Sequence, residues 1–183
     1  MKIISGKLKG REIKNKYIEG TRPTMDRVKE SVFSSIQDYI KNSVCLDLFA
    51  GTGNLGIEAI SNGADKCYFT DNNIKCINDI KETIQKFNIQ NESVVIKKDY
   101  RDALKYFAEN NIKFNLIFLD PPYKNKIINE IIEFIYNNNL LYENGLIICE
   151  YESDELDIDN IKFNLKKYKK YGSKKVSIFE SNV

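Results

Sequence analysis

The chain of 183 residues contains no histidine and no tryptophan. The absence of histidine excludes Ser-His-Asp and Cys-His catalysis, together with any general base that uses an imidazole. Its four cysteines show no C-x-x-C spacing, so with no histidine to complement them a zinc site has too few plausible ligands. We therefore expect no metal, and buried reduced thiols at Cys45, Cys67, Cys76 and Cys149.

Long hydrophobic runs are also missing. No stretch approaches the roughly 18 to 20 apolar residues of a membrane span, and residues 1–6 lack the hydrophobic segment of a signal peptide. We therefore expect a cytoplasmic protein that does not enter a membrane. With 183 residues and 42% hydrophobic content, the chain can form one domain over 1–183. We expect a basic N-terminal appendage at 1–20 and a core at 21–183.

The formal net charge is only +2, but the charges are unevenly distributed. Residues 1–41 contain ten basic and five acidic side chains, residues 42–161 contain 11 and 20, and residues 162–175 contain seven and none. If both basic ends fold onto one side, they form a surface suited to a phosphate backbone. Solvated surface lysines in a lysine-rich chain would give the same counts, so charge alone leaves both interpretations open.

From Val44 onward, short β-rich runs alternate with helical patterns, which predicts βαβ units and a parallel sheet. Before them, Thr24 can N-cap an amphipathic helix with an apolar stripe at Val28, Val32, Ile36, Tyr39 and Ile40. The predicted fold is α/β, with a doubly wound, mostly parallel, seven-stranded sheet. Its strands are expected at Val44–Phe49, Lys66–Thr70, Ser93–Lys97, Phe114–Leu119, Gly145–Tyr151, Phe163–Tyr171 and Lys174–Glu180, and its further helices at Asn54–Ser61, Ile74–Phe87, Tyr100–Glu109 and Ile127–Tyr136.

Two β-hairpins are expected at the ends of the chain. At the C-terminal end, Gly172-Ser173 suits a two-residue turn between antiparallel strands, which would extend the sheet beyond its fifth strand. Near the N-terminus, the alternation and the glycines of residues 3–11 fit a small basic hairpin.

A glycine-rich turn follows the first predicted strand. Gly51 and Gly53 let the backbone turn sharply and approach a ligand closely. The spacing Gly51-x-Gly53-x-x-Gly56 is also the dinucleotide fingerprint, and Asp71, about 20 residues further on, suits ribose hydroxyls. The turn therefore predicts a cofactor that contains a nucleoside, without choosing between S-adenosylmethionine and NAD.

Aspartates stand at the ends of the first four predicted strands. The carboxyl ends of parallel strands form the ligand-binding edge of an open α/β sheet. Asp47 could bind the ammonium group of a methionine moiety, directly or through water, and Asp99 could accept a hydrogen bond from an adenine amino group. A cationic sulfonium suits an acidic pocket better than a pyrophosphate does, so the pattern favours S-adenosylmethionine. The candidate cofactor residues are Asp47, Phe49, Ala50, Gly51, Thr52, Gly53, Asp71, Asn72, Asp99 and Tyr100.

The fourth predicted strand is followed by Asp120-Pro121-Pro122-Tyr123, the candidate catalytic residues. The prolines restrict the backbone and remove two N–H donors, so the carbonyls of Asp120 and Pro121 can point into a cleft. The Asp120 carboxylate and the Pro121 carbonyl could accept both hydrogens of an exocyclic amino group, while Tyr123 stacks on the base. Such residues also form ordinary turns. Their position beside the glycine turn favours methylation of an amino group on a nucleic-acid base.

Together these motifs resemble the bacterial 16S ribosomal RNA guanine-N2 methyltransferases of the small-subunit methyltransferase D type. The resemblance covers nearly the whole chain and lies in residues 3–6, 10–11, 21–30, 47–53, Asp99, 120–123 and 171–172. It implies a Rossmann-like class I methyltransferase fold, S-adenosylmethionine as cofactor, and transfer to guanine N2 in an assembling small subunit. Adenine-N6 DNA methyltransferases share the glycine and Asp-Pro-Pro-Tyr motifs, whereas Arg22-Pro23-Thr24 narrows the match. Asn72 and Asn73 depart from the family, which often has charged residues there.

The N-terminal region supplies the candidate phosphate contacts, each of which could equally be an ordinary surface side chain. They are Lys7, Lys9, Arg11, Arg22, Thr24 and Arg27. We expect a monomer that binds 16S rRNA or a small-subunit assembly intermediate.

Three other functions stay open. The first is a DNA adenine-N6 methyltransferase, although a chain of this length leaves little room for a sequence-reading domain. The second is a nicotinamide-dependent oxidoreductase, which the glycine spacing alone would allow. The third is an RNA-binding assembly factor without catalytic activity.

Overall fold

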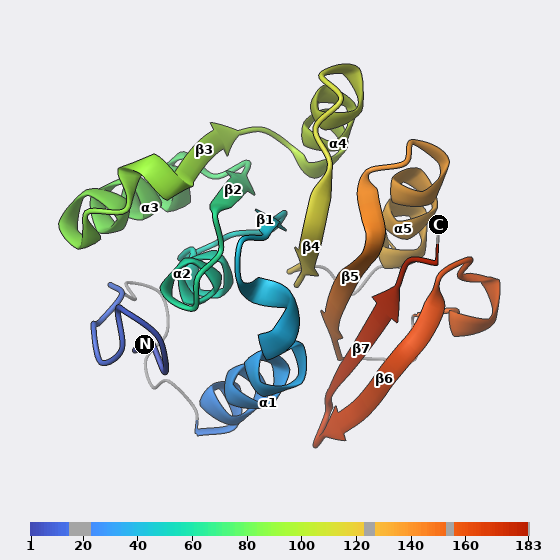
Figure 1. Cartoon of the computed structure of the whole chain (residues 1–183), viewed down its shortest axis with the longest axis horizontal. Coiled ribbons are helices and arrows are strands. Elements are labelled where there is room, and N and C mark those ends of the chain that lie inside the picture. The colour runs from blue at the N-terminus through green and yellow to red at the C-terminus, as the bar shows by residue number, and fades with distance from the viewer. Residues whose placement is uncertain (15–22, 123–126, 153–155, 183) are drawn as a thin grey trace.

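The computed structural model describes residues 1–14, 23–122, 127–152 and 156–182. Its centre is a seven-stranded sheet in the order β3-β2-β1-β4-β5-β7-β6 (Figure 1). The first five strands are parallel, and β7 runs antiparallel to both of its neighbours, β5 and β6. The predicted mostly parallel sheet with a terminal antiparallel hairpin is confirmed. The strands are β1 (Val44–Asp47), β2 (Lys66–Asp71), β3 (Ser93–Lys97), β4 (Phe114–Leu119), β5 (Leu141–Tyr151), β6 (Asn164–Tyr171) and β7 (Lys174–Glu180).

Helices cover both faces of the sheet, as a doubly wound fold requires. Three of them, α1 (Pro23–Ile40), α2 (Asn54–Ser61) and α3 (Ile74–Phe87), share one apolar core, and α4 (Tyr100–Glu109) and α5 (Ile127–Asn137) share the other. From β1 the chain proceeds outward to β2 and β3, then returns across the sheet to β4. This reversal creates a topological switch point between β1 and β4, where such folds bind ligands.

The apolar stripe of α1 is buried as predicted. Val28, Val32, Ile36 and Ile40 are at most 3% exposed, and Tyr39 packs partly buried against the same core. The predicted N-cap was wrong, because the helix begins at Pro23 and the backbone of Thr24 is already helical. Proline suits a first helical position, since its fixed φ is helical and an N–H there would lack a partner anyway.

Some strand boundaries differ from the prediction for local reasons. β1 ends at Asp47 rather than Phe49, because the chain there leaves the ladder for the glycine turn. β5 begins at Leu141 rather than Gly145, since Leu141 pairs with Phe114 across a register irregularity. Shifts of one residue occur at the ends of β2 and α5 and at the start of β6. The remaining predicted ranges of strands and helices are confirmed.

The N-terminal segment folds back on itself, and the predicted small hairpin is present as a short antiparallel pairing in which the Ile3 N–H donates to the Arg11 carbonyl and the Ile13 N–H to the Met1 carbonyl. Its ladder is one isolated antiparallel bridge, between Lys2 and Glu12. Other backbone donors of the segment bind α2: the Ile4 and Ser5 N–H groups donate to the Glu58 carboxylate, and the Lys7 N–H donates to the Ser61 carbonyl. Ile3, Leu8 and Ile13 of this segment are buried in the main core.

The C-terminal hairpin turns at Gly172, whose φ of +61° favours glycine. Strand β6 forms the outer edge of the sheet, and the side chains of residues 164–170 are all exposed. All four cysteines are free, with Cys45, Cys67 and Cys149 buried as expected and Cys76 partly exposed. Among the described helices, none is long and apolar enough to cross a lipid bilayer.

Candidate active site

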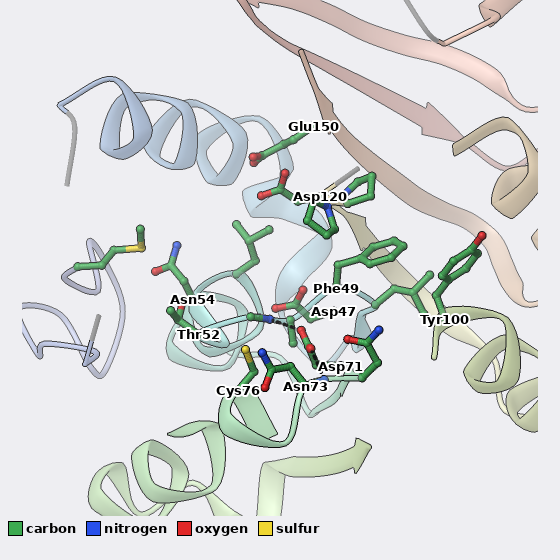
Figure 2. A pocket seen from close by; sticks show the side chains of 18 of the residues that line it. Asp47, Phe49, Thr52, Asn54, Asp71, Asn73, Cys76, Tyr100, Asp120 and Glu150 are labelled. Atoms are coloured by element: carbon green, nitrogen blue, oxygen red, sulfur yellow. Dashed lines mark hydrogen bonds between the residues drawn. The ribbon is translucent and has the colours of Figure 1, made fainter. Parts of the chain in front are cut away.

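A cavity of about 680 Å³ lies at the carboxyl ends of β1, β2 and β4 and at the loop that follows β3 (Figure 2). It brings together the four aspartates that the sequence placed at strand ends. Every predicted cofactor residue except Gly53 lines it: Asp47, Phe49, Ala50, Gly51, Thr52, Asp71, Asn72, Asp99 and Tyr100. The wall also includes Met25, Val28 and Lys29 from α1 and Lys174 from β7.

The glycine turn connects β1 to α2 and forms one side of this cavity. Gly53 caps α2 in the left-handed region, with φ of +80°, and lies beneath the lining against Ile57 and Ile80. Gly56 sits in the first turn of α2, where an added Cβ would come within 2.3 Å of the Phe69 ring. Glycine at these positions therefore turns the chain and lets α2 approach β2 closely.

Two aspartates hold the backbone of the turn. Asp47 accepts a hydrogen bond from the Gly56 N–H at 3.0 Å, and Asp71 accepts one from the Gly51 N–H at 3.0 Å. Asp47 is only 2% exposed, and burial raises its pKa to about 7, against the opposing effect of the Gly56 hydrogen bond. Asp47 thus stabilises the glycine turn through its Oδ2, which leaves its Oδ1 for a hydrogen bond to a ligand.

The far end of the cavity combines a carboxylate with an aromatic wall. Asp99 caps α4, because its Oδ1 accepts a hydrogen bond from the Arg101 N–H at 2.9 Å. The rings of Phe49 and Tyr100 lie 5.4 Å apart and are tilted by 44°. This end therefore offers apolar surface beside a hydrogen-bond acceptor, which suits a purine ring with an amino group.

The predicted catalytic loop lies at the end of β4. Asp120, Pro121 and Pro122 line the cavity, while Tyr123 falls outside the described residues. Asp120 pairs with Lys174, whose Nζ lies 3.3 Å from the Asp120 Oδ1. The same Nζ lies 3.2 Å from the Oε2 of Glu150, a buried residue of β5. The structure thus adds a lysine and a second acid to the predicted loop.

A second group that the sequence did not reveal centres on Lys29. Its Nζ lies 3.0 Å from the Glu58 Oε1 and donates to the Lys2 carbonyl at 2.7 Å and the Asn54 Oδ1 at 2.8 Å. Lys29 and Glu58 are almost fully buried, so each charge depends on the other. This group ties the N-terminal segment and α1 to the start of α2, beside the glycine turn.

Glu58 and Glu150 did carry a signal in the sequence. Each is the only charged residue in an apolar segment, 54–61 and 145–151 respectively, and a buried acid requires a partner. The sequence gives no comparable signal for Lys29 or Lys174, because both come from segments with several charged side chains.

The predicted phosphate contacts are spread over the molecule. Lys7 pairs with Glu92 at 3.0 Å, and Arg11 donates to the Lys86 carbonyl and lies over the Phe87 ring. Glu92 directly precedes β3 and Lys86 lies in the last turn of α3, so Lys7 and Arg11 lie at the amino edge of the sheet, away from the cavity. Lys9 lies between Lys7 and Arg11 in the chain and is exposed. Arg27 is exposed on α1, near the cavity. Arg22 lies outside the described residues, as does the side chain of Thr24.

The residues of the cavity fit S-adenosylmethionine. The glycine turn leaves the backbone open to a ligand, and three carboxylates at strand ends suit a cofactor with an ammonium group, a sulfonium and two ribose hydroxyls. The aromatic pair beside Asp99 suits its adenine. A dinucleotide would place a pyrophosphate among these acids, which Coulomb repulsion disfavours.

Comparison with known proteins identifies the family. The model of the family described as conserved hypothetical protein 95 matches residues 1–180. The chain belongs to this family. It is 38% identical over 156 residues to the ribosomal RNA small subunit methyltransferase D of Haemophilus influenzae, covering 85% of this chain and 80% of that protein. Against the Escherichia coli K12 protein of the same name the identity is 30% over 152 residues, covering 83% and 75%.

The fold agrees with this assignment. The solved structure of the Escherichia coli protein yhhF superposes with a TM-score of 0.86 and 26% identity, covering 99% of this chain and 97% of that one. The family shares the class I methyltransferase fold, so the predicted Rossmann-like architecture and the resemblance to methyltransferase D proteins are both confirmed.

Proposed function

We propose that the protein transfers a methyl group from S-adenosylmethionine to the exocyclic N2 amino group of a guanine in 16S rRNA. One observation carries the proposal: Asp120-Pro121-Pro122 and the glycine turn line the same cavity, together with Asp47, Asp71 and Asp99. A loop rich in acceptors thereby faces a site suited to a cationic methyl donor. Membership of the methyltransferase D family supports rRNA as the substrate class.

The residues of the loop would act mainly by positioning the amino group. Its nitrogen is a poor nucleophile, because its lone pair is delocalised into the ring. When the Asp120 carboxylate and the Pro121 carbonyl accept its two hydrogens, the lone pair can turn toward the methyl carbon. S-adenosylmethionine, when bound, supplies an electrophilic methyl group on a sulfonium. Tyr123 is proposed to stack on the base and hold the attack in line.

The choice of guanine N2 rests on the resemblance around Arg22-Pro23-Thr24, and the choice of the small ribosomal subunit rests on the names of the relatives. Both relatives described above are named for the small ribosomal subunit. A cytoplasmic assembly intermediate of that subunit is the proposed partner. A monomer is the proposed functional state.

The geometry favours the carboxyl edge of the sheet for contact with the target nucleotide. Strand β6 is parallel to β5, so its end at Lys169 and Lys170 lies at the same edge as the cavity. Lys174 follows the turn and contacts Asp120 directly. We propose that Lys169, Lys170 and Arg27 bind phosphates near the target, whereas Lys7, Lys9 and Arg11 bind a more distant part of the RNA.

The test is transfer of labelled methyl from S-adenosylmethionine to small subunits that lack the modification, followed by nuclease digestion and identification of the methylated base. We expect N2-methylguanine, and loss of at least about 100-fold in rate for Asp120→Ala, because the acceptor for the amino group is removed. Asp38→Ala, on the exposed face of α1, is the matched control and should transfer normally.

Other outcomes would replace this function. N6-methyladenine formed in DNA would favour the adenine methyltransferase. Tight NAD binding without S-adenosylmethionine binding would favour an oxidoreductase. Subunit binding without any transfer would favour a catalytically silent assembly factor.

A further inference from the structure

Three charged side chains meet where strands β4, β5 and β7 reach the carboxyl edge of the sheet. Leu119 pairs with Cys149, so the next residues along the two parallel strands, Asp120 and Glu150, are neighbours. Lys174 begins β7, which pairs with β5 on its other side. Side chains alternate between the two faces of a strand, so all three lie on the face of the sheet that α1 covers. They lie next to the buried apolar side chains of β4, β5 and β7 on that face.

The three side chains are in direct contact. The Lys174 Nζ lies 3.3 Å from the Asp120 Oδ1 and 3.2 Å from the Glu150 Oε2. The Lys174 Nζ thus holds the two carboxyl groups beside each other, and Figure 2 shows them pointing toward one another above the glycine turn. Two neighbouring carboxylates repel each other when both are ionised, so this pair is suited to hold a proton.

The two acids differ in exposure, and this difference gives the proton a direction. The Asp120 side chain is 38% exposed and lines the cavity, whereas the Glu150 side chain is 8% exposed. Burial, and to a lesser extent the Asp120 charge, raise the pKa of Glu150 to about 7, against the opposing effect of Lys174. A proton that arrives at Asp120 is therefore better accommodated on Glu150.

Lys174 remains a cation in this setting. Burial alone would lower its pKa, but the charges of Asp120 and Glu150 outweigh that effect and raise it. The other acid that acts on the pair is Asp47, whose charge interacts with Asp120 from β1, and the Cys149 thiol is buried next to Glu150 in β5. Three acids, Asp47, Asp120 and Glu150, therefore interact here with one cation, Lys174.

Methylation of an amino group creates a proton that must leave. The nitrogen lone pair forms the new N–C bond, the methyl–sulfur bond breaks with its electron pair going to sulfur, and the nitrogen then loses one hydrogen as a proton. In a chain without histidine, no imidazole can accept it. We propose that Asp120 takes this proton from the methylated nitrogen and passes it to Glu150, while Lys174 holds both carboxyl groups in place. This proposal rests on the proposed function.

Glu150 and Lys174 are positioning and proton-holding residues in this scheme, since only Asp120 touches the substrate. After transfer, the N–H bonding pair returns to nitrogen as its lone pair and the proton rests on the Glu150 carboxylate, from which solvent removes it after product release. The reaction therefore needs Glu150 ionised at the start of each turnover, so the rate should rise with pH.

The kinetic test compares single-turnover transfer to small subunits from pH 5.5 to 8.5. For the wild type we expect the rate to rise about tenfold per pH unit below about 7 and to level off above it. Glu150→Gln keeps the size of the side chain and should lose the inflection near 7 and about 10- to 100-fold in rate, with unchanged KM for subunits. Lys174→Arg should retain the wild-type profile, whereas Lys174→Met should lose rate as Glu150→Gln does.

A second readout is independent of activity. In protein labelled with ¹³C at the glutamate δ-carbon, one resonance should titrate near pH 7 and vanish in Glu150→Gln, while Asp47 carries no such label. A wild-type profile in Glu150→Gln, or no glutamate titrating near 7, would overturn the proton proposal. If instead the wild type transfers nothing to subunits while the glutamate still titrates near 7, the proposed function fails and the acid pair stands.

Discussion

Asp47 shows how one buried carboxylate links stability to pH. Its pKa is raised from 3.8 to about 7 in the folded chain, mainly by burial. Between these values the folded state binds the proton more readily than the unfolded state does. Stability from this residue therefore falls as pH rises from about 4 to about 7, and is constant above that range.

The variant Asp47→Asn should remove this dependence, because an amide can still accept the Gly56 N–H but does not ionise. We expect its free energy of unfolding, relative to the wild type, to increase from pH 4.5 to 7 in urea titrations of the ligand-free protein. Asp38→Asn, at an exposed site, is the control and should track the wild type. A constant difference between Asp47→Asn and wild type over this range would contradict the raised pKa.

Individual site residues differ in how far the sequence reveals them. Asp47, Asp71, Asp99 and Asp120 were predictable, because strand order alone brings strand ends to one edge. The partners of Glu150 were not, since Lys174 reaches it only through the pairing of β5 with β7. Nothing local in the sequence specifies which lysine will neutralise a buried acid.

Helix α2 depends on its close approach to β2. An added Cβ at Gly56 would lie 2.3 Å from Phe69 Cε1 and 2.6 Å from the Cys67 Sγ, and both neighbours are fully buried in the core. Gly56→Ala should therefore destabilise the protein by about 2 kcal/mol through overpacking, although alanine favours helix. Because the helix starts at the glycine turn, its displacement should also weaken S-adenosylmethionine binding.

The measurement is urea unfolding together with calorimetric titration of S-adenosylmethionine. Phe69→Leu removes the ring atoms nearest to the added methyl group, so it serves as the matched second change. The double variant should lose less unfolding free energy than the sum of the losses in the two single variants, because the smaller side chain relieves the clash. Simple additivity would show that Gly56 is not packed as the structure has it.

The sequence predicted the existence and order of the helices and strands better than the residues at which they end. The period of apolar residues identified α3 and α4 to the residue, since their buried stripes coincide with the pattern. The N-terminal hairpin has only a short antiparallel pairing, and its glycines and alternation do not show that Glu58 and Ser61 bind other backbone donors of the same segment.

Across the whole molecule, the basic ends of the chain lie on opposite sides of α1 (Figure 1). Lys29 binds the Lys2 carbonyl, while Lys167 of β6 binds Ser35 on the same helix. Among the described residues, it is the C-terminal side that brings a dense run of lysines to the edge with the cavity. The basic charge of both ends was evident from the sequence, but not which end lies nearer to the catalytic loop.

The double variant Lys169→Ala with Lys170→Ala should weaken binding to small-subunit RNA and lower the slope of log affinity against log salt by about 1 to 2, as expected for two phosphate contacts. Lys81→Ala with Lys86→Ala, on exposed positions of α3, is the matched control and should leave the slope unchanged. Equal effects of both pairs would mean that binding depends on overall charge rather than on this edge.

The insertion of β7 between β5 and β6 has a consequence for synthesis of the protein on the ribosome. The cavity takes its glycine turn, its aspartates and Glu150 from residues 47–150, but Lys174 is translated after all of them. Until β7 emerges and docks, Asp120 and Glu150 have no Lys174 between them, and the edge of β5 is unpaired. The nascent chain can therefore form most of its cofactor pocket before synthesis ends. The contacts of Asp120 and Glu150 with Lys174 form only after β7 has been synthesised and has paired with β5.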